Sequence, residues 1–251
     1  MPRNPLLALG TLLLAAFLGA AAFALLQPMM PGNDRARTEA IVRDYVLSHP
    51  EILPEAMQRL QEREVGKVVS ANRSGIETPF AGAWAGNAQG DVTLVAYMDY
   101  ACGYCRASLP AIDRLLAEDP KIRIVYRELP ILSPASRTAA EWALAAAQQG
   151  KFRPFHEALY AEGQPDEAAI QRAAAKADLD MTRARAAAAS PAVQQEIARN
   201  IQQAGQLGVT GTPTWVIGNQ MLSGAIGYEG LTAAVAKARA SGDAPTDAAG
   251  A

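Results

Sequence analysis

The feature that most constrains this chain is its pair of cysteines, Cys102 and Cys105, which lie where an apolar run gives way to a helical pattern. Residues 92–98 are dense in β-branched and aromatic side chains, which predicts a strand. Residues 102–118 carry apolar side chains at helical spacing, which predicts a helix. The first turn of a helix offers free N–H groups and partial positive charge, which favour a thiolate. We therefore expect Cys102 to be an exposed nucleophile and Cys105 to be the shielded partner that resolves a mixed disulfide.

Two structural interpretations of these cysteines are weaker. A disulfide across so short a loop stabilises a fold by only roughly 2 kcal/mol, through the entropy that it removes from the unfolded chain. A purely structural disulfide would therefore contribute little here. A zinc site needs about four ligands, and the two histidines, His49 and His156, stand at spacings unlike those of any zinc finger. We expect His156 to be a packing residue in a helix and expect no metal at the cysteines. Redox or thiolate chemistry is therefore the favoured interpretation.

The remaining pattern predicts an α/β domain with an all-helical insertion. A second strand over 122–126 completes a strand–helix–strand unit, which pairs its strands in parallel. Residues 134–207 are rich in alanine, helical in pattern and without a strand candidate. Two short strands are predicted at 214–217 and 220–222, and a last helix is predicted at 228–240. We expect this domain to cover residues 78–240 and a flexible tail to follow at 241–251.

The amino terminus predicts export. Between Arg3 and Asp34 there is no charge, and a helix over residues 5–26, at about 1.5 Å per residue, could cross a hydrocarbon core of roughly 30 Å. A positive charge on the amino side places the rest of the chain on the exported side. Ala22-Phe23-Ala24 is a possible cleavage site. We expect residues 1–27 to be either an uncleaved signal anchor, which we favour, or a cleaved signal peptide.

Residues 28–77 predict a linker followed by an amphipathic helical segment. Ile41, Val42, Tyr45 and Val46 share one helical face, and a second apolar stripe begins at Ile52. Two such helices cannot bury their stripes alone. We expect them to form a homo-oligomer through residues 36–76, with docking on the following domain as the alternative. The formal net charge of −2 argues against a nucleic-acid partner, which needs a basic face.

A second motif, Gly211-Thr212-Pro213-Thr214, stands just ahead of a predicted strand. By itself it is consistent with an edge-strand proline. Together with the cysteines, it makes the chain resemble the DsbA-like branch of the thioredoxin superfamily, and more narrowly the copper-sensitivity suppressor (ScsC-like) proteins. The stretches that carry the resemblance are Met98–Cys105, Arg127–Ile131, Gly150–His156 and Gly208–Trp215.

The resemblance implies a thioredoxin fold with an inserted all-helical subdomain, preceded by an N-terminal helical segment. It implies a cis peptide bond before Pro213, beside Cys102, with Thr212 orienting a substrate peptide. It also implies periplasmic thiol–disulfide exchange on exported proteins that contain cysteines, with a membrane or periplasmic redox partner to recycle the chain. No cofactor is implied beyond the redox-active disulfide Cys102–Cys105. The sequence departs from the family at Ala96, where members often carry a buried acid, and Asp99 is a doubtful substitute.

The direction of electron flow stays open. Gly103 and Tyr104 between the cysteines, and Thr212 before the proline, resemble disulfide isomerases more than strong oxidases. We therefore lean to an isomerase or reductase, with a DsbA-like dithiol oxidase as the alternative. A copper(I)-binding thiolate module is a further alternative, because soft thiolates select that ion.

Overall fold

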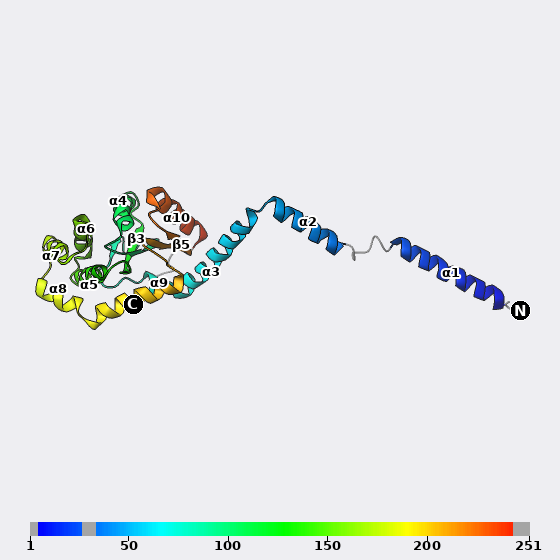
Figure 1. Ribbon diagram of the computed structural model, residues 1–251, viewed down its shortest axis with the longest axis horizontal. Coiled ribbons are helices and arrows are strands. Elements are labelled where there is room, and N and C mark those ends of the chain that lie inside the picture. Colours follow the sequence, from blue (N-terminus) through cyan, green and yellow to red (C-terminus); the bar gives the residue numbers. More distant parts are fainter. Residues whose placement is uncertain (1–4, 27–33, 243–251) are drawn as a thin grey trace. The chain divides into compact units, whose positions relative to one another are not determined.

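The computed structural model describes residues 5–26 and 34–242 (Figure 1). The chain divides into two compact units, Met1–Arg59 and Leu60–Ala251. Of the linker expected from residue 28, residues 28–33 lie outside the described residues, as do residues 243–251 of the tail expected at 241–251. The boundary between the units falls inside the helix Ile52–Glu77.

The first unit contains two helices and the start of a third: α1 (Pro5–Leu26), α2 (Asp34–Ser48) and α3 (Ile52–Glu77). Within the part of the chain that the structure describes, no helix combines the length and apolar character that crossing a membrane requires. The signal anchor and the cleaved signal peptide expected over residues 1–27 both stay predictions.

The second unit is built on a five-stranded mixed sheet with the order β1-β3-β2-β4-β5. Its strands are β1 (Trp84–Gly86), β2 (Val92–Met98), β3 (Ile122–Glu128), β4 (Thr214–Ile217) and β5 (Gln220–Ser223). The parallel pairing of β2 with β3 confirms the expected strand–helix–strand unit, and the other neighbours pair antiparallel. The short edge strand β1 was not expected. The mixed sheet confirms the predicted thioredoxin fold.

Between β3 and β4 the described chain is helical apart from connecting loops, as the alanine-rich pattern predicts. The helices of the second unit are α4 (Gly103–Glu118), α5 (Pro134–Gln148), α6 (Phe152–Glu162), α7 (Glu167–Lys176), α8 (Met181–Ala188), α9 (Pro191–Leu207) and α10 (Gly227–Ser241). Besides α4, four of them begin at a side-chain oxygen that accepts a backbone N–H of the first turn, which satisfies a donor that the helix leaves free. These N-caps are Ser133, Asp166, Asp180 and Ser190.

Alternation along β2 divides the apolar core between the two faces of the sheet. Leu94, Ala96 and Met98 belong to the core that also contains the cysteines, on the face covered by α4 and α10. Val95 and Tyr97 belong to a second core. Figure 1 shows α4 and α10 on one side of the sheet, and α9 with the end of α3 on the other.

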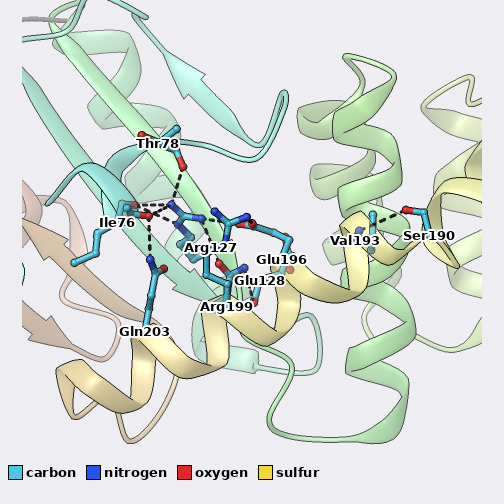
Figure 2. Close-up of polar contacts among 11 residues, drawn as sticks. Ile76, Thr78, Arg127, Glu128, Ser190, Val193, Glu196, Arg199 and Gln203 are labelled. Carbon is cyan, nitrogen blue, oxygen red and sulfur yellow. Dashed lines mark hydrogen bonds and ion pairs between the residues drawn. The ribbon is translucent and has the colours of Figure 1, made fainter. Parts of the chain in front are cut away.

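The carboxyl-terminal part of α3 is fastened to the second unit by Arg127 of β3. The guanidinium donates to the carbonyls of Gly75, Ile76 and Thr78 at 2.7, 2.9 and 2.7 Å, and it pairs with the Glu196 carboxylate at 2.6 Å. Figure 2 shows this guanidinium between the end of α3 and α9. A cation at a helix carboxyl terminus satisfies free carbonyls and opposes the partial negative charge there. This contact explains why α3 crosses the boundary between the units.

The N-terminal helical segment was expected either to form a homo-oligomer or to dock on the following domain. The structure treats its two ends differently. Val69 and Ile76 are fully buried in the second core, so this part of α3 docks on its own domain. In contrast, Val42 on α2 and Met57 on α3 are 55% and 70% exposed. The residues between 34 and 60 keep an apolar surface without a described partner in the chain.

Candidate active site

Cys102 is the N-cap of α4, with β-region backbone angles of φ −82° and ψ 114°. Its Sγ accepts the backbone N–H of Cys105 at 3.4 Å, and its own N–H donates to the Asp99 carbonyl at 3.0 Å. The side chain is 5% exposed, so the expectation of an exposed nucleophile is wrong for this structure. The reason is the loop that carries Thr212, whose carbonyl lies 3.1 Å from the Cys102 Sγ and covers it.

The peptide bond between Thr212 and Pro213 is cis, as the resemblance implied. This bond lies in the loop between α9 and β4, and it stands beside Cys102 although 110 residues separate Thr212 from that cysteine. The carbonyl of Pro213 accepts the backbone N–H of Gly224 at 2.8 Å, which ties the loop to the residue after β5. The structure thus brings together the cysteine and proline motifs.

The two residues between the cysteines are exposed. Tyr104 is 71% exposed, and a Cβ added to Gly103 would meet no atom within 4 Å. Packing therefore does not dictate either residue, which leaves both free to contact a docked chain.

Cys105 is fully buried below Cys102, as expected for a shielded partner. Burial raises the pKa of its thiol well above the ordinary value, and the nearby polar groups of Asp99 and Thr212 offset this only in part. Both cysteines are free thiols in the structure. Cys105 can therefore become a good nucleophile only if a neighbouring group takes its proton.

Asp99, the doubtful substitute for the acid absent at Ala96, is a structural anchor. Its carboxylate accepts three backbone N–H groups, from Ala101 at 2.8 Å, Ile131 at 2.9 Å and Leu132 at 3.0 Å. Three such bonds fix the loop that leads into Cys102 against the loop that follows β3.

A buried polar cluster beside the cysteines escaped the sequence reasoning. The Tyr100 hydroxyl donates to Glu128 Oε1 at 3.3 Å and lies 2.9 Å from His156 Nδ1. The Tyr160 hydroxyl donates to the Asp99 carbonyl at 3.0 Å. His156 is buried among aromatic rings, which confirms it as a packing residue, and burial lowers its pKa to about 3. The one sequence signal for this cluster was Glu128 itself. It lies two residues after the predicted strand 122–126, so strand alternation places it on the same face as Tyr126.

In the described residues, no group of three or more histidine, cysteine, aspartate or glutamate side chains is placed to hold a metal ion. The arrangement offers instead a thiol at a helix amino terminus, a second thiol beneath it and a backbone carbonyl before a cis proline. These are parts suited to thiol–disulfide exchange with a peptide.

A family model described as the DSBA-like thioredoxin domain matches residues 93–236, more than half of the chain. The chain belongs to this family. A second model, the copper resistance protein ScsC N-terminal domain, matches residues 34–65. The DSBA-like match thus covers the cysteines, the cis proline and the sheet apart from β1 and the first residue of β2, and the ScsC-type match covers α2 and the start of α3.

Solved structures agree with this assignment. A thioredoxin-like oxidoreductase from Silicibacter pomeroyi is 38% identical, with a TM-score of 0.65 over 67% of this chain and 98% of that chain. The thiol–disulfide exchange protein α-DsbA2 of Wolbachia pipientis is 26% identical, with a TM-score of 0.65 over 71% and 97%. A linker-deletion mutant of Proteus mirabilis ScsC, 24% identical with a TM-score of 0.65, covers 84% of this chain and 98% of its own, and it shows the shared fold.

Two curated relatives are parts of much longer proteins. The Na(+)/H(+) antiporters NhaA 3 of Salinispora tropica and NhaA 1 of Salinispora arenicola are each 36% identical, over 159 and 156 residues. Those matches cover 62% and 61% of this chain, which spans only 24% of either relative. The similarity therefore concerns one domain of those proteins.

Proposed function

We propose that this DSBA-like protein is a periplasmic thiol–disulfide oxidoreductase that acts on exported proteins containing cysteines. One observation carries the proposal: Cys102 Sγ lies at the amino terminus of α4, 3.1 Å from the carbonyl that precedes the cis proline. In that position the Cys102 sulfur and the backbone of Thr212 can engage the same extended peptide. The named relatives, described as thioredoxin-like and thiol–disulfide exchange proteins, support the same chemistry.

In the proposed reaction, the Cys102 thiolate attacks a substrate disulfide and forms a mixed disulfide, releasing one substrate thiolate. Cys105 then attacks Cys102 Sγ, which forms the Cys102–Cys105 disulfide and releases the second substrate thiolate. The reverse sequence oxidises a substrate dithiol. Thr212 and Pro213 orient the peptide, and the electrons are held by the Cys102–Cys105 pair without a further cofactor. A membrane or periplasmic redox partner resets the pair.

We favour isomerase or reductase activity over that of a dithiol oxidase. The Gly103-Tyr104 pair and Thr212 support this direction by their resemblance to isomerases. Exposed apolar side chains on α2 and on the start of α3 support a homo-oligomer, whose paired sites suit repeated attack on wrongly paired substrates. A DsbA-like oxidase is the alternative.

The proposed location rests on the uncharged amino-terminal segment. We propose that residues 1–27 direct export, and a related structure from Salmonella enterica is described as a periplasmic thioredoxin-like protein. Cell fractionation tests this. Retention in alkali-washed membranes would indicate the favoured anchor, release with the periplasmic contents would indicate a cleaved signal peptide, and recovery with the cytoplasmic contents would contradict export.

A second candidate function is copper(I) binding by the two thiolates, because soft thiolate ligands favour copper(I). The match of residues 34–65 to a domain described as part of a copper resistance protein supports it. Stoichiometric copper(I) uptake by the reduced protein, without any disulfide exchange, would favour this function over the oxidoreductase.

Trapping of the mixed disulfide tests the roles of the two cysteines. With Cys105→Ser, the resolving step is lost, so substrate is expected to accumulate as a covalent adduct on Cys102 in non-reducing gels and mass spectra. The matched variant Cys102→Ser should form no adduct. Normal release of substrate by Cys105→Ser would contradict the assigned roles.

A further inference from the structure

Four acidic side chains are buried in the part of the chain that the structure describes. They are Glu77, Asp99, Glu128 and Glu196. Two of them are paired with arginines, and Asp99 is held by three backbone N–H groups. Glu128 differs from these, because its carboxyl accepts one hydrogen bond, from Tyr100, and forms no ion pair with any described residue. A buried carboxyl with so little support is costly to folding, which indicates a role other than stability.

Glu128 lies on the face of the sheet that carries the cysteines. It is the last residue of β3, and its partner in the parallel register is Met98 of β2. Two residues earlier, Tyr126 pairs with Ala96, and both belong to the core that contains Cys105. Because side chains alternate along a strand, Glu128 points to this same face. The chain thus has no acid at Ala96 but has one on the neighbouring strand, nearer to the strand ends where the cysteines begin.

Tyr100 links Glu128 to the cysteine pair. Its hydroxyl contacts Glu128, and its ring lies in the same buried core as Cys102 and Cys105. The negative charge of Cys105 is among the influences that raise the pKa of Tyr100, after burial and Glu128. Tyr100 also precedes Cys102 by only two residues. The tyrosine thus contacts the buried acid and shares one core with the resolving thiol.

Among the titratable groups that face this cluster, Glu128 is the suitable proton acceptor. Burial raises its pKa well above the ordinary value, the Tyr100 hydrogen bond offsets this in part, and the nearby Asp99 adds to the rise. A carboxylate with a raised pKa is a stronger base. His156 is a weak base because burial lowers its pKa, and Tyr126 and Tyr160 are hydroxyls whose pKa values burial raises.

We propose that Glu128, acting through the Tyr100 hydroxyl, takes up the proton that Cys105 releases when it resolves the mixed disulfide. In this step the Cys105 sulfur bonds to Cys102 Sγ, and the bond between Cys102 Sγ and the substrate sulfur breaks with its electron pair on the substrate. The Cys105 proton passes to the tyrosine oxygen, whose own proton passes to the carboxylate. In the oxidising direction, Glu128 returns the proton to Cys105. The inference rests on the proposed exchange activity of the two cysteines.

The test separates the two chemical steps with an aromatic disulfide whose released thiolate is coloured, mixed with the reduced full chain in a stopped-flow instrument. The first release reports attack by Cys102, and the second reports resolution by Cys105. For Glu128→Gln, the second release at neutral pH should slow about a hundredfold, the lower end of what positioned general acid–base catalysis contributes. The first release should be unchanged. Glu77→Gln, a change at a buried acid on the opposite face with a raised pKa, is the matched control and should leave both phases unchanged.

The pH profile gives a readout that a purely structural role would not move. In the natural protein the second phase should rise with pH and level off as Glu128 loses its proton. In Glu128→Gln it should continue to rise in proportion to hydroxide, so that the two proteins converge in alkaline solution. Tyr100→Phe, which keeps the ring, should reproduce this behaviour and carries the test if Glu128→Gln does not fold.

The outcomes separate the two proposals. If the natural protein gives no second release, the proposed exchange activity fails. If it gives both releases and the second-phase profiles of Glu128→Gln or Tyr100→Phe superimpose on its own, the proton role of Glu128 is overturned while the exchange activity stands.

Discussion

At the scale of single residues, strand alternation gives two adjacent charged residues of β3 opposite tasks. Arg127 points to the face where α3 and α9 pack. It donates to backbone carbonyls at the end of α3 and forms an ion pair with Glu196 (Figure 2). Glu128 points to the face of the cysteines and contacts Tyr100. Arg127 therefore stabilises the packing of α3, and Glu128 has the proposed role in proton transfer.

Replacing Arg127 with methionine should lower the free energy of unfolding by about 3 kcal/mol, as expected when one partner of a buried pair is removed. The loss should fall at the lower end of that range because Arg199 also pairs with Glu196. Urea denaturation measures it. The control is Lys67→Met, a change in an exposed pair with Glu64 that should have little effect on unfolding because solvent and salt screen such a pair. An equal effect of both changes would contradict the role given to Arg127.

His156 should make the protein less stable in mild acid. Burial lowers its pKa from 6.5 to about 3, so between these values the unfolded chain binds a proton that the native chain does not. The free energy of unfolding therefore falls as pH falls through this window, and His156→Phe should remove about 2 kcal/mol of the loss between about pH 7 and about pH 5. Urea midpoints at the two pH values measure this. His49→Phe, at the other histidine, is the control, and an unchanged acid dependence in His156→Phe would contradict the prediction.

At the scale of elements, the structure repeats the sequence predictions wherever one segment decides its own conformation. The strand at Val92–Met98 has the predicted bounds because its apolar run is continuous, and the helix after Cys102 follows from its spacing. The three-residue strand β1, with its terminal glycine, carries no such signal and forms by pairing with β3. The charged end of β3 was equally hidden, because Arg127 and Glu128 resemble surface residues until their buried partners are known.

The same limit applies to the candidate site. The cysteines and the cis proline carry motifs, so their proximity could be expected from the resemblance. The covering of Cys102 by Thr212 and the anchoring role of Asp99 depend on contacts between loops far apart in the sequence. Such contacts leave no periodic pattern in a single sequence.

The two parts of α3 should respond differently to truncation of an apolar side chain. Ile76→Ala should lower the free energy of unfolding by about 2 to 4 kcal/mol, because it leaves a cavity in the second core. Met57→Ala, at a residue that is 70% exposed, should have little effect on unfolding of the second unit. Urea denaturation of the two variants measures this. Equal losses would contradict the division of α3 into docked and free parts.

At the scale of the whole molecule, the proposed homo-oligomer rests on the exposed apolar side chains of residues 34–60. Val42→Asp with Met57→Asp should shift the protein from an oligomer to a monomer, because each places a charge on that surface. Sedimentation analysis measures the mass. The control pair, Arg37→Asp with Asp44→Lys, changes charge at exposed positions of the same segment without altering an apolar side chain. An unchanged mass for the first pair would contradict association through this surface.

The central claim is that Cys102 and Cys105 exchange disulfides with exported proteins. It is tested most directly by paired assays in which the purified protein meets a scrambled or a fully reduced form of a multi-disulfide test protein. We expect reactivation of the scrambled form at a rate well above that of the reduced form, and no reactivation by Cys102→Ser. Activity in neither assay, with both thiols intact and reduced, would contradict the account.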